Sequence, residues 1–189
     1  LKGLPLPREC GGVLIWLHPT RPEQIFASPY GQGLWRSADR GKSWKRIDTD
    51  ANRLSHGAFA PDGRLLVAGA EGLYSVDGDS VRRLDRRPMI GNRSWASIAS
   101  SPDGEAIFAI DEGGRLFKTR DEGTRWHQIP FTTRTGAGDV PWLAWKNNDW
   151  LSVASIQFDP AVPNRIWLYE GSGVWFAELN SRSESVNWV

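Results

Sequence analysis

Short apolar runs alternate with turn-forming stretches along the whole chain. The clearest runs are Ile25–Phe26, Leu65–Val67, Ile107–Phe108 and Ile166–Trp167, and a proline-containing polar stretch precedes each of them. Short runs bounded by Pro, Gly, Asn and Asp predict β-strands. No window of about 11 residues shows a convincing 3.6-residue period, so no amphipathic helix is predicted.

The runs belong to a repeat. Its four units open near Pro19, Pro61, Pro102 and Pro160, which are 42, 41 and 58 residues apart. Units of roughly 40–45 residues with three or four strands each are typical of β-propeller blades. We therefore predict an all-β chain with a single domain over residues 1–189. It would contain about four four-stranded blades, at residues 10–50, 51–90, 91–130 and 150–189.

The signature Ser/Thr-x-Asp-x-Gly-x-x-Trp occurs twice. Its residues are Ser37, Asp39, Gly41 and Trp44 and, 82 residues later, Thr119, Asp121, Gly123 and Trp126. The aspartate can accept backbone N–H groups of a turn, the glycine can adopt a positive φ, and the indole can cover the turn. A carboxylate used in this way is not free for chemistry. We interpret both signatures as structural elements of hairpin turns, and the second and fourth units lack the full pattern.

The interval before the fourth unit exceeds the other two by 16 or 17 residues, which predicts an insertion loop at residues 131–150. Long insertions in a regular repeat are a first place to look for function. The segment contains Trp142, Trp145 and Trp150, with Asn147, Asn148 and Asp149 between them. Such a group of aromatic and polar side chains is a candidate ligand-binding surface. The alternative is that the three tryptophans form a small hydrophobic cluster within the loop.

Composition argues against several classes of partner. The net charge of +1 gives no strong field toward nucleic acid or an anionic membrane. No apolar stretch approaches the ~18 residues of a membrane span. Cys10 is the only cysteine, and the three histidines fall at unrelated positions of the repeat. We therefore expect no internal disulfide, no metal site and no cofactor.

The paired signatures resemble the Asp-box, or BNR repeat, of sialidase-superfamily propellers. The last third of the chain resembles glycoside hydrolase family 74 more specifically, through the segments Pro141–Trp145, Ile156–Pro160 and Tyr169–Trp175. Enzymes of that family are xyloglucanases with two seven-bladed propellers and a substrate groove between them. The resemblance implies that the four blades are part of a larger propeller, of seven blades, in a secreted protein. An arc of four blades would also leave sheet edges open, which favours a larger propeller.

The resemblance implies an acid and a base aspartate, one from each propeller. The family's first aspartate lies in an Arg-Thr-Asp-Val-Gly-Gly segment, and the nearest match here, Ser28–Trp35, contains no aspartate. The second lies in a Gly-Asp-Ile-Gly-Gly-Phe segment, which Gly138-Asp139-Val140 resembles only superficially. Asp139 is thus a weak candidate for the catalytic acid or base, and loop capping is its alternative role.

Two functions from different classes are compatible with these features. The first, which the resemblance implies, is part of a secreted polysaccharide-binding glycoside hydrolase acting on xyloglucan or a related β-glucan. In it the indoles of Trp142, Trp145 and Trp150 would stack on sugar rings, and Asn147, Asn148 and Asp149 would bind hydroxyls. Its partners would be a polysaccharide or oligosaccharide and the remainder of the same propeller or a second propeller. The second is a non-catalytic Asp-box propeller that acts as a protein-binding receptor or assembly scaffold, since one fold hosts many functions.

Overall fold

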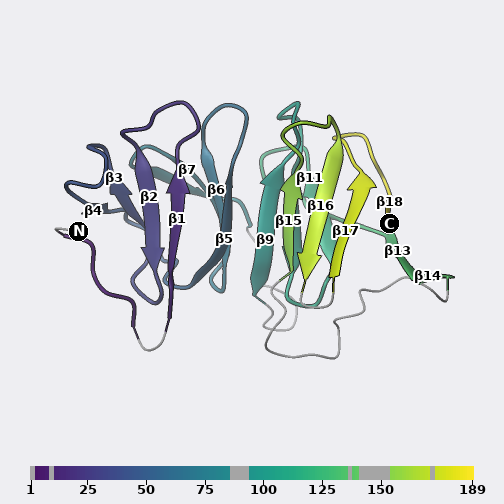
Figure 1. Cartoon of the computed structure of the whole chain (residues 1–189), viewed down its shortest axis with the longest axis horizontal. Coiled ribbons are helices and arrows are strands. Elements are labelled where there is room, and N and C mark those ends of the chain that lie inside the picture. Colours follow the sequence, from purple (N-terminus) through teal and green to yellow (C-terminus); the bar gives the residue numbers. More distant parts are fainter. Residues whose placement is uncertain (1–2, 9–10, 86–93, 136–137, 141–153, 171–172) are drawn as a thin grey trace.

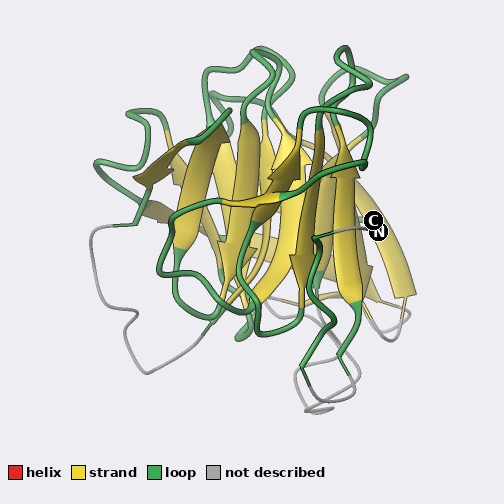
Figure 2. Cartoon of the chain, turned by 90° about the vertical axis from the view of Figure 1, so that its left-hand side faces the viewer, coloured by secondary structure: helices red, strands yellow, loops and turns green. Residues whose placement is uncertain are grey.

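The computed structural model describes residues 3–8, 11–85, 94–135, 138–140, 154–170 and 173–189. Every regular element in these ranges is a β-strand, and the loops gather at the two ends of the strands (Figure 2). The predicted all-β fold is confirmed. Within the described ranges there is no helix long and apolar enough to cross a membrane.

The first three sheets are four-stranded, antiparallel and ordered as in the chain. Blade 1 contains β1 (Val13–Leu17), β2 (Ile25–Pro29), β3 (Trp35–Ser37) and β4 (Lys45–Arg46). Blade 2 contains β5 (Leu54–Phe59), β6 (Leu65–Gly69), β7 (Leu73–Asp77) and β8 (Ser80–Arg83). Blade 3 contains β9 (Trp95–Ser100), β10 (Ile107–Asp111), β11 (Leu116–Thr119) and β12 (His127–Ile129). The sheets follow one another along the long axis of the molecule (Figure 1).

The fourth blade is built differently. Its three antiparallel strands are β15 (Ser155–Phe158), β16 (Arg165–Glu170) and β17 (Gly173–Glu178). β18 (Val186–Trp188) follows on the outer side, where its neighbour Val189 exchanges two backbone hydrogen bonds with Phe176 of β17, at 2.9 and 3.1 Å. The outer strand of blade 4, β18, is therefore held to β17 by the two hydrogen bonds of the adjacent Val189 and not by a ladder of several paired residues.

The segment predicted as an insertion loop begins with two strands, β13 (Phe131–Thr135) and β14 (Gly138–Val140), which pair antiparallel. β13 also pairs in parallel with β18, and Phe131 lies opposite Val186. The chain leaving blade 3 thus adds a strand to the outer side of blade 4 (Figure 1). This pairing covers an edge that would otherwise present unpaired backbone groups.

Apolar side chains fill the interfaces between consecutive blades. Side chains alternate between the two faces of a strand, so a blade between two others must be apolar on both faces. β6 and β10 meet this demand and are buried at every position. Each interface has its own core cluster: Phe26 and Leu65 belong to the cluster of blades 1 and 2, Leu66 and Ile98 to that of blades 2 and 3, and Phe108 and Ile156 to that of blades 3 and 4.

Ion pairs also join each blade to the next. In every case an acid in the turn before the fourth strand binds a base on the preceding blade: Asp79 to Lys45 at 2.6 Å, Glu122 to Arg64 at 2.7 Å, and Glu184 to Lys118 at 2.8 Å. The hydrogen bond from the base is the main cause that lowers the pKa of each acid. Pairs with exposed partners contribute about 0–1 kcal/mol each, so apolar packing carries most of the stability.

The two end blades each leave one apolar face open. On β1, Leu14 and Trp16 face blade 2, whereas Val13, Ile15 and Leu17 on the other side are 39%, 57% and 67% exposed. Blade 4 likewise exposes Tyr169, Val174 and Phe176 on the side away from blade 3. These faces have the alternating apolar pattern that the inner blades bury against each other.

Candidate functional site

The first signature turn connects β3 to β4. The Ser37 hydroxyl donates to Asp39 Oδ1 at 2.8 Å and accepts the Gly41 N–H at 2.8 Å. Asp39 in turn accepts the Ser43 N–H at 2.9 Å and the Ser43 hydroxyl at 2.5 Å. The bond from the Ser43 hydroxyl is the largest of the causes that lower the pKa of Asp39 to about 2. The Asp39 carboxylate therefore stabilises the turn through these hydrogen bonds.

The second signature turn, between β11 and β12, repeats this geometry. The Thr119 hydroxyl donates to Asp121 Oδ1 at 2.8 Å and accepts the Gly123 N–H at 3.0 Å. Asp121 accepts the Arg125 N–H at 2.8 Å, the main cause of its lowered pKa. Each of the two turns connects the third strand of its blade to the fourth. Successive turns of an antiparallel sheet lie alternately at the two ends of its strands, so both signature turns lie at the same end of their blades.

The opposite edge carries the ends of the second strands, the starts of the third strands and the starts of the first strands. It is the lower edge in Figure 1, toward which the β2 arrow points. β15 begins at this edge with Ser155, so the chain re-enters blade 4 there after the predicted insertion. We call this end of the strands the lower edge of the blades, a term that does not refer to an edge strand.

The predicted sugar-binding residues Trp142, Trp145, Asn147, Asp149 and Trp150 lie outside the described residues. Their roles stay predictions. Asp139 lies on β14, where it pairs across the ladder with Arg134 of β13. Its catalytic role also stays a prediction, since the backbone position alone assigns no chemistry.

A hollow of about 540 Å³ opens at the lower edge of blade 1. It lies between the β2–β3 turn and the connection from β4 to β5. The side chains and backbone that line it come from Arg8, Tyr30, Gly31, Gln32, Trp35, Arg46, Asn52 and Arg53. Among the described residues, this lining combines three guanidinium groups, two aromatic rings and two amides, and it includes no carboxylate.

Local backbone geometry brings these groups together. The Arg8 N–H donates to Tyr30 O at 2.9 Å, which fixes the N-terminal segment beside the β2–β3 turn. Trp35 and Arg46 are cross-strand partners, so their side chains share one face of blade 1. The Trp35 indole N–H donates to Gln32 O at 2.9 Å, which ties the ring to the turn.

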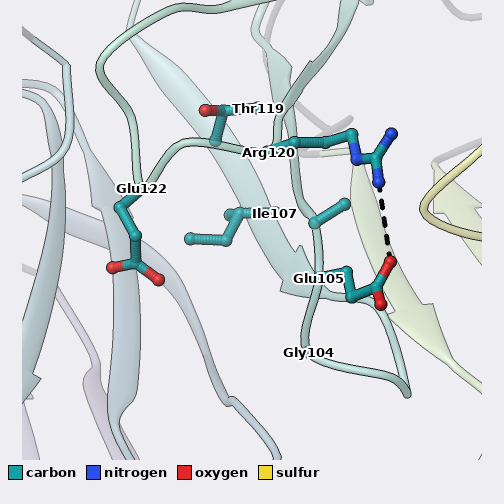
Figure 3. Close-up of a pocket in the computed structure, with 7 residues that line it drawn as sticks. Gly104, Glu105, Ile107, Thr119, Arg120 and Glu122 are labelled. Carbon is teal, nitrogen blue, oxygen red and sulfur yellow. Dashed lines mark ion pairs between the residues drawn. The ribbon is translucent and has the colours of Figure 1, made fainter.

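A second hollow, of about 320 Å³, lies beside the second signature turn and has its charges already paired. Figure 3 shows Arg120 directed toward Glu105, an ion pair of 3.6 Å, with Glu122 on the other side. Glu122 binds Arg64 and Arg82 of blade 2. A ligand would have to break these pairs, which makes this hollow the weaker candidate for a charged ligand.

A third hollow, of about 380 Å³, lies among the first strands of all four blades and contains His56. Burial lowers the pKa of His56 to about 4. Its Nδ1 accepts the Ile98 N–H at 3.4 Å from the next blade. The imidazole is therefore neutral near pH 7 and links blades 2 and 3. Among the described residues, no group of three or more His, Cys, Asp or Glu side chains could hold a metal ion.

Sequence reasoning missed the arginine-lined hollow. Its arginines lie at positions 8, 46 and 53 and form no motif of fixed spacing. The pairing of Trp35 with Arg46 depends on strand register, and the position of Arg8 depends on a contact with Tyr30. The sequence alone carried no signal for either.

Comparison with known proteins places the fold. No protein-family model matches the sequence, and no curated protein sequence matches it. A glycoside hydrolase family 74 xyloglucanase from Xanthomonas campestris is similar in structure with a TM-score of 0.68 and 18% identity, over 92% of this chain and 29% of the xyloglucanase. An ancestral family 74 enzyme gives a TM-score of 0.65 and 22% identity, over 97% of this chain and 24% of the enzyme.

A third similar structure is an auxiliary nutrient binding protein from Bacteroides thetaiotaomicron. It has a TM-score of 0.64 and 9% identity, over 94% of this chain and 40% of that protein. This chain spans less than a third of the two family 74 structures. At these identities the similarity concerns the fold: the chain forms part of a β-propeller.

Proposed function

We propose that this chain is part of a secreted polysaccharide-binding propeller protein of the glycoside hydrolase type, with xyloglucan or a related β-glucan as its substrate. The observation that carries the proposal is the similarity of all four blades to two family 74 structures. The Pro-Trp-rich segment at residues 141–145 adds support from the sequence.

The lower edge is the proposed sugar-binding surface. The signature turns at the other edge use Asp39 and Asp121 for their own hydrogen bonds. The lower edge instead carries the arginine-lined hollow with Tyr30 and Trp35, and β15 begins there. Aromatic planes pack against the apolar faces of pyranose rings, and amides bind hydroxyl groups. The Asp-box assignment and a catalytic role for Asp139 belong to the same proposal.

Further blades would complete the propeller, on this polypeptide or on a second one. The open faces at β1 and at β16–β17 support this part of the proposal, since each exposes three large apolar side chains. Contiguous apolar surface of this kind marks an interaction site.

The alternative is a propeller that binds without catalysis. The similarity to a nutrient binding protein favours it, because that structure shares the fold at a TM-score of 0.64. The receptor or assembly-scaffold role belongs to this class.

Isothermal titration with a xyloglucan oligosaccharide tests the proposal. Wild type is expected to bind, and Trp145→Ala is expected to weaken binding by about tenfold or more, as loss of an aromatic stacking partner does. Trp44→Phe at the opposite edge serves as the control and is expected to bind like wild type. Absence of binding by a folded wild-type chain would contradict the sugar-binding function.

A further inference from the structure

The arginines of the lower-edge hollow differ in their partners. Arg53 Nε lies 3.7 Å from Glu71, the nearest carboxylate. Glu71 also accepts the backbone N–H groups of Asn52 and Arg53, at 3.2 and 3.1 Å. Glu71 is thus the ion-pair partner of Arg53, and among the described residues neither Arg8 nor Arg46 has a carboxylate partner.

Arg8 and Arg46 retain free donors. Within the part of the chain that the structure describes, the Arg8 guanidinium makes no hydrogen bond or ion pair, and both side chains are exposed. Arg46 donates one long bond, 3.4 Å, to Asn52 Oδ1. A guanidinium has five N–H donors, so most of this capacity is unused at the rim of the hollow that both residues line.

Two glycines hold these side chains close to the turn. The stem of Arg8 lies over Gly31, whose Cβ would come within 3.3 Å of Arg8 Cδ. The Arg46 guanidinium lies over Gly33, where a Cβ would be 3.3 Å from Nη2. Both glycines have positive φ, +71° and +75°. The absence of a side chain at these two positions lets both arginines lie close to the turn, in the hollow that Tyr30 and Trp35 also line.

This chemistry selects a carboxylated sugar. Guanidinium groups bind carboxylates through paired, charge-assisted hydrogen bonds. The rings of Tyr30 and Trp35 line the same hollow, and aromatic rings pack against the apolar faces of pyranoses. The Gln32 and Asn52 amides each donate one bond within the protein, to Leu6 O and Asp50 O, and keep a second N–H for a hydroxyl group. A neutral glucan would leave the two arginines unused.

We propose that this hollow binds a uronic acid unit of an acidic polysaccharide, with its carboxylate on Arg8 and Arg46 and its ring beside Trp35. This inference rests on the proposed polysaccharide-binding function and adds to it the charge of the sugar at this position. The site consists of described residues only.

Isothermal titration of the full chain tests it with trigalacturonate, with the matched neutral galactotriose, and with a xyloglucan oligosaccharide. Trigalacturonate is expected to bind at least tenfold more tightly than galactotriose. Arg8→Gln and Arg46→Gln are each expected to weaken trigalacturonate binding by about ten- to a hundredfold, as removal of a charged hydrogen bond does. Arg182→Gln, an exposed arginine on blade 4, is the control and should bind like wild type.

Arg8→Gln keeps the test valid if Arg46→Gln fails to fold, because the Arg8 guanidinium has no internal partner to lose. Circular dichroism and thermal unfolding establish the fold of each variant. Equal binding of trigalacturonate and galactotriose, or unchanged binding in Arg8→Gln, would overturn the inference. So would tighter binding of a hexaglutamate peptide than of trigalacturonate, because the site would then be a peptide site.

The titration separates the two proposals. If xyloglucan binds and trigalacturonate does not, the uronic acid site is contradicted and the proposed function still holds. Binding of trigalacturonate alone would support this site and replace the neutral glucan as substrate. Binding of neither sugar would contradict both.

Discussion

The indole N–H of Trp126 donates to the backbone carbonyl of Leu84 at 3.1 Å, across the interface from blade 3 to blade 2. Leu84 follows β8 and is buried, and the Trp126 ring lies 5.9 Å from that of Trp95. The signature tryptophan thus does more than cover its own turn. It fastens one blade to the preceding one.

Replacing Trp126 by Phe should lower the free energy of unfolding by about 1–3 kcal/mol, because the buried Leu84 carbonyl loses its donor. Urea unfolding followed by circular dichroism measures this. Trp44→Phe is the matched control: the Trp44 Nε1 is buried without a partner, so its removal should cost less. Equal losses for the two variants would show that the interblade hydrogen bond contributes nothing specific.

Gly123 packs against the same carbonyl, with no room for a side chain. A Cβ at this position would lie 2.1 Å from Leu84 O, and φ is +85°. Gly123→Ala should therefore cost more than about 3 kcal/mol, through both the backbone conformation and the clash. Gly78 has φ +57° with open space around it, so Gly78→Ala isolates the conformational cost, about 1–2 kcal/mol. Denaturant unfolding that ranks the two variants equally would argue against the close approach.

His56 should make stability depend on pH between 5 and 7. Burial lowers its pKa to about 4 in the folded state, against about 6.5 when unfolded. The unfolded state then binds more protons in this range, so stability is full above about pH 6.5 and falls as the pH drops toward 4. The loss from pH 7 to pH 5 should be about 2 kcal/mol.

His56→Asn provides the comparison, because its amide oxygen can still accept the Ile98 N–H. The His56→Asn variant should lose the pH dependence of the unfolding free energy that His56 causes. It should keep the part that the other titratable groups cause. Unfolding free energies at pH 5, 6 and 7 measure the difference. Parallel pH profiles for wild type and variant would contradict the assignment to His56.

The open end faces should promote association. Leu17 and Val174 are 67% and 58% exposed on faces that have the pattern of an interblade surface. Sedimentation velocity should show that wild type associates as its concentration rises, whereas the Leu17→Lys, Val174→Lys double variant stays monomeric. Its unfolding free energy should stay within about 0.5 kcal/mol of wild type, since both sites are on the surface. A wild type that stays monomeric would argue against blade docking on these faces.

The fold was predictable because the local signals agree with the final structure. The apolar run at Ile107–Phe108 begins β10, and the Gly and Asp positions of the signatures lie in the turns before the fourth strands. The parallel pairing of Phe131 with Val186 was not predictable. It joins segments far apart in the chain, and no sequence pattern marks such a contact.

The candidate site was less predictable for a similar reason. Tryptophans in a long insertion draw attention as a cluster in sequence, whereas Arg8 and Arg46 meet only after blade 1 has folded. Trp35 has an ordinary position in the repeat, and its proposed role beside a sugar ring follows only from the groups that surround it in the folded blade. Residues that act through tertiary proximity leave little trace in a single sequence.

A crystal structure of the chain with a bound xyloglucan oligosaccharide would locate the sugar-binding surface. We expect sugar at the lower edge, where the second strands of the blades end and β15 begins. Sugar bound at the opposite edge, beside Ser43 or Thr124 of the signature turns, would contradict it, as would an empty lower edge at saturating ligand.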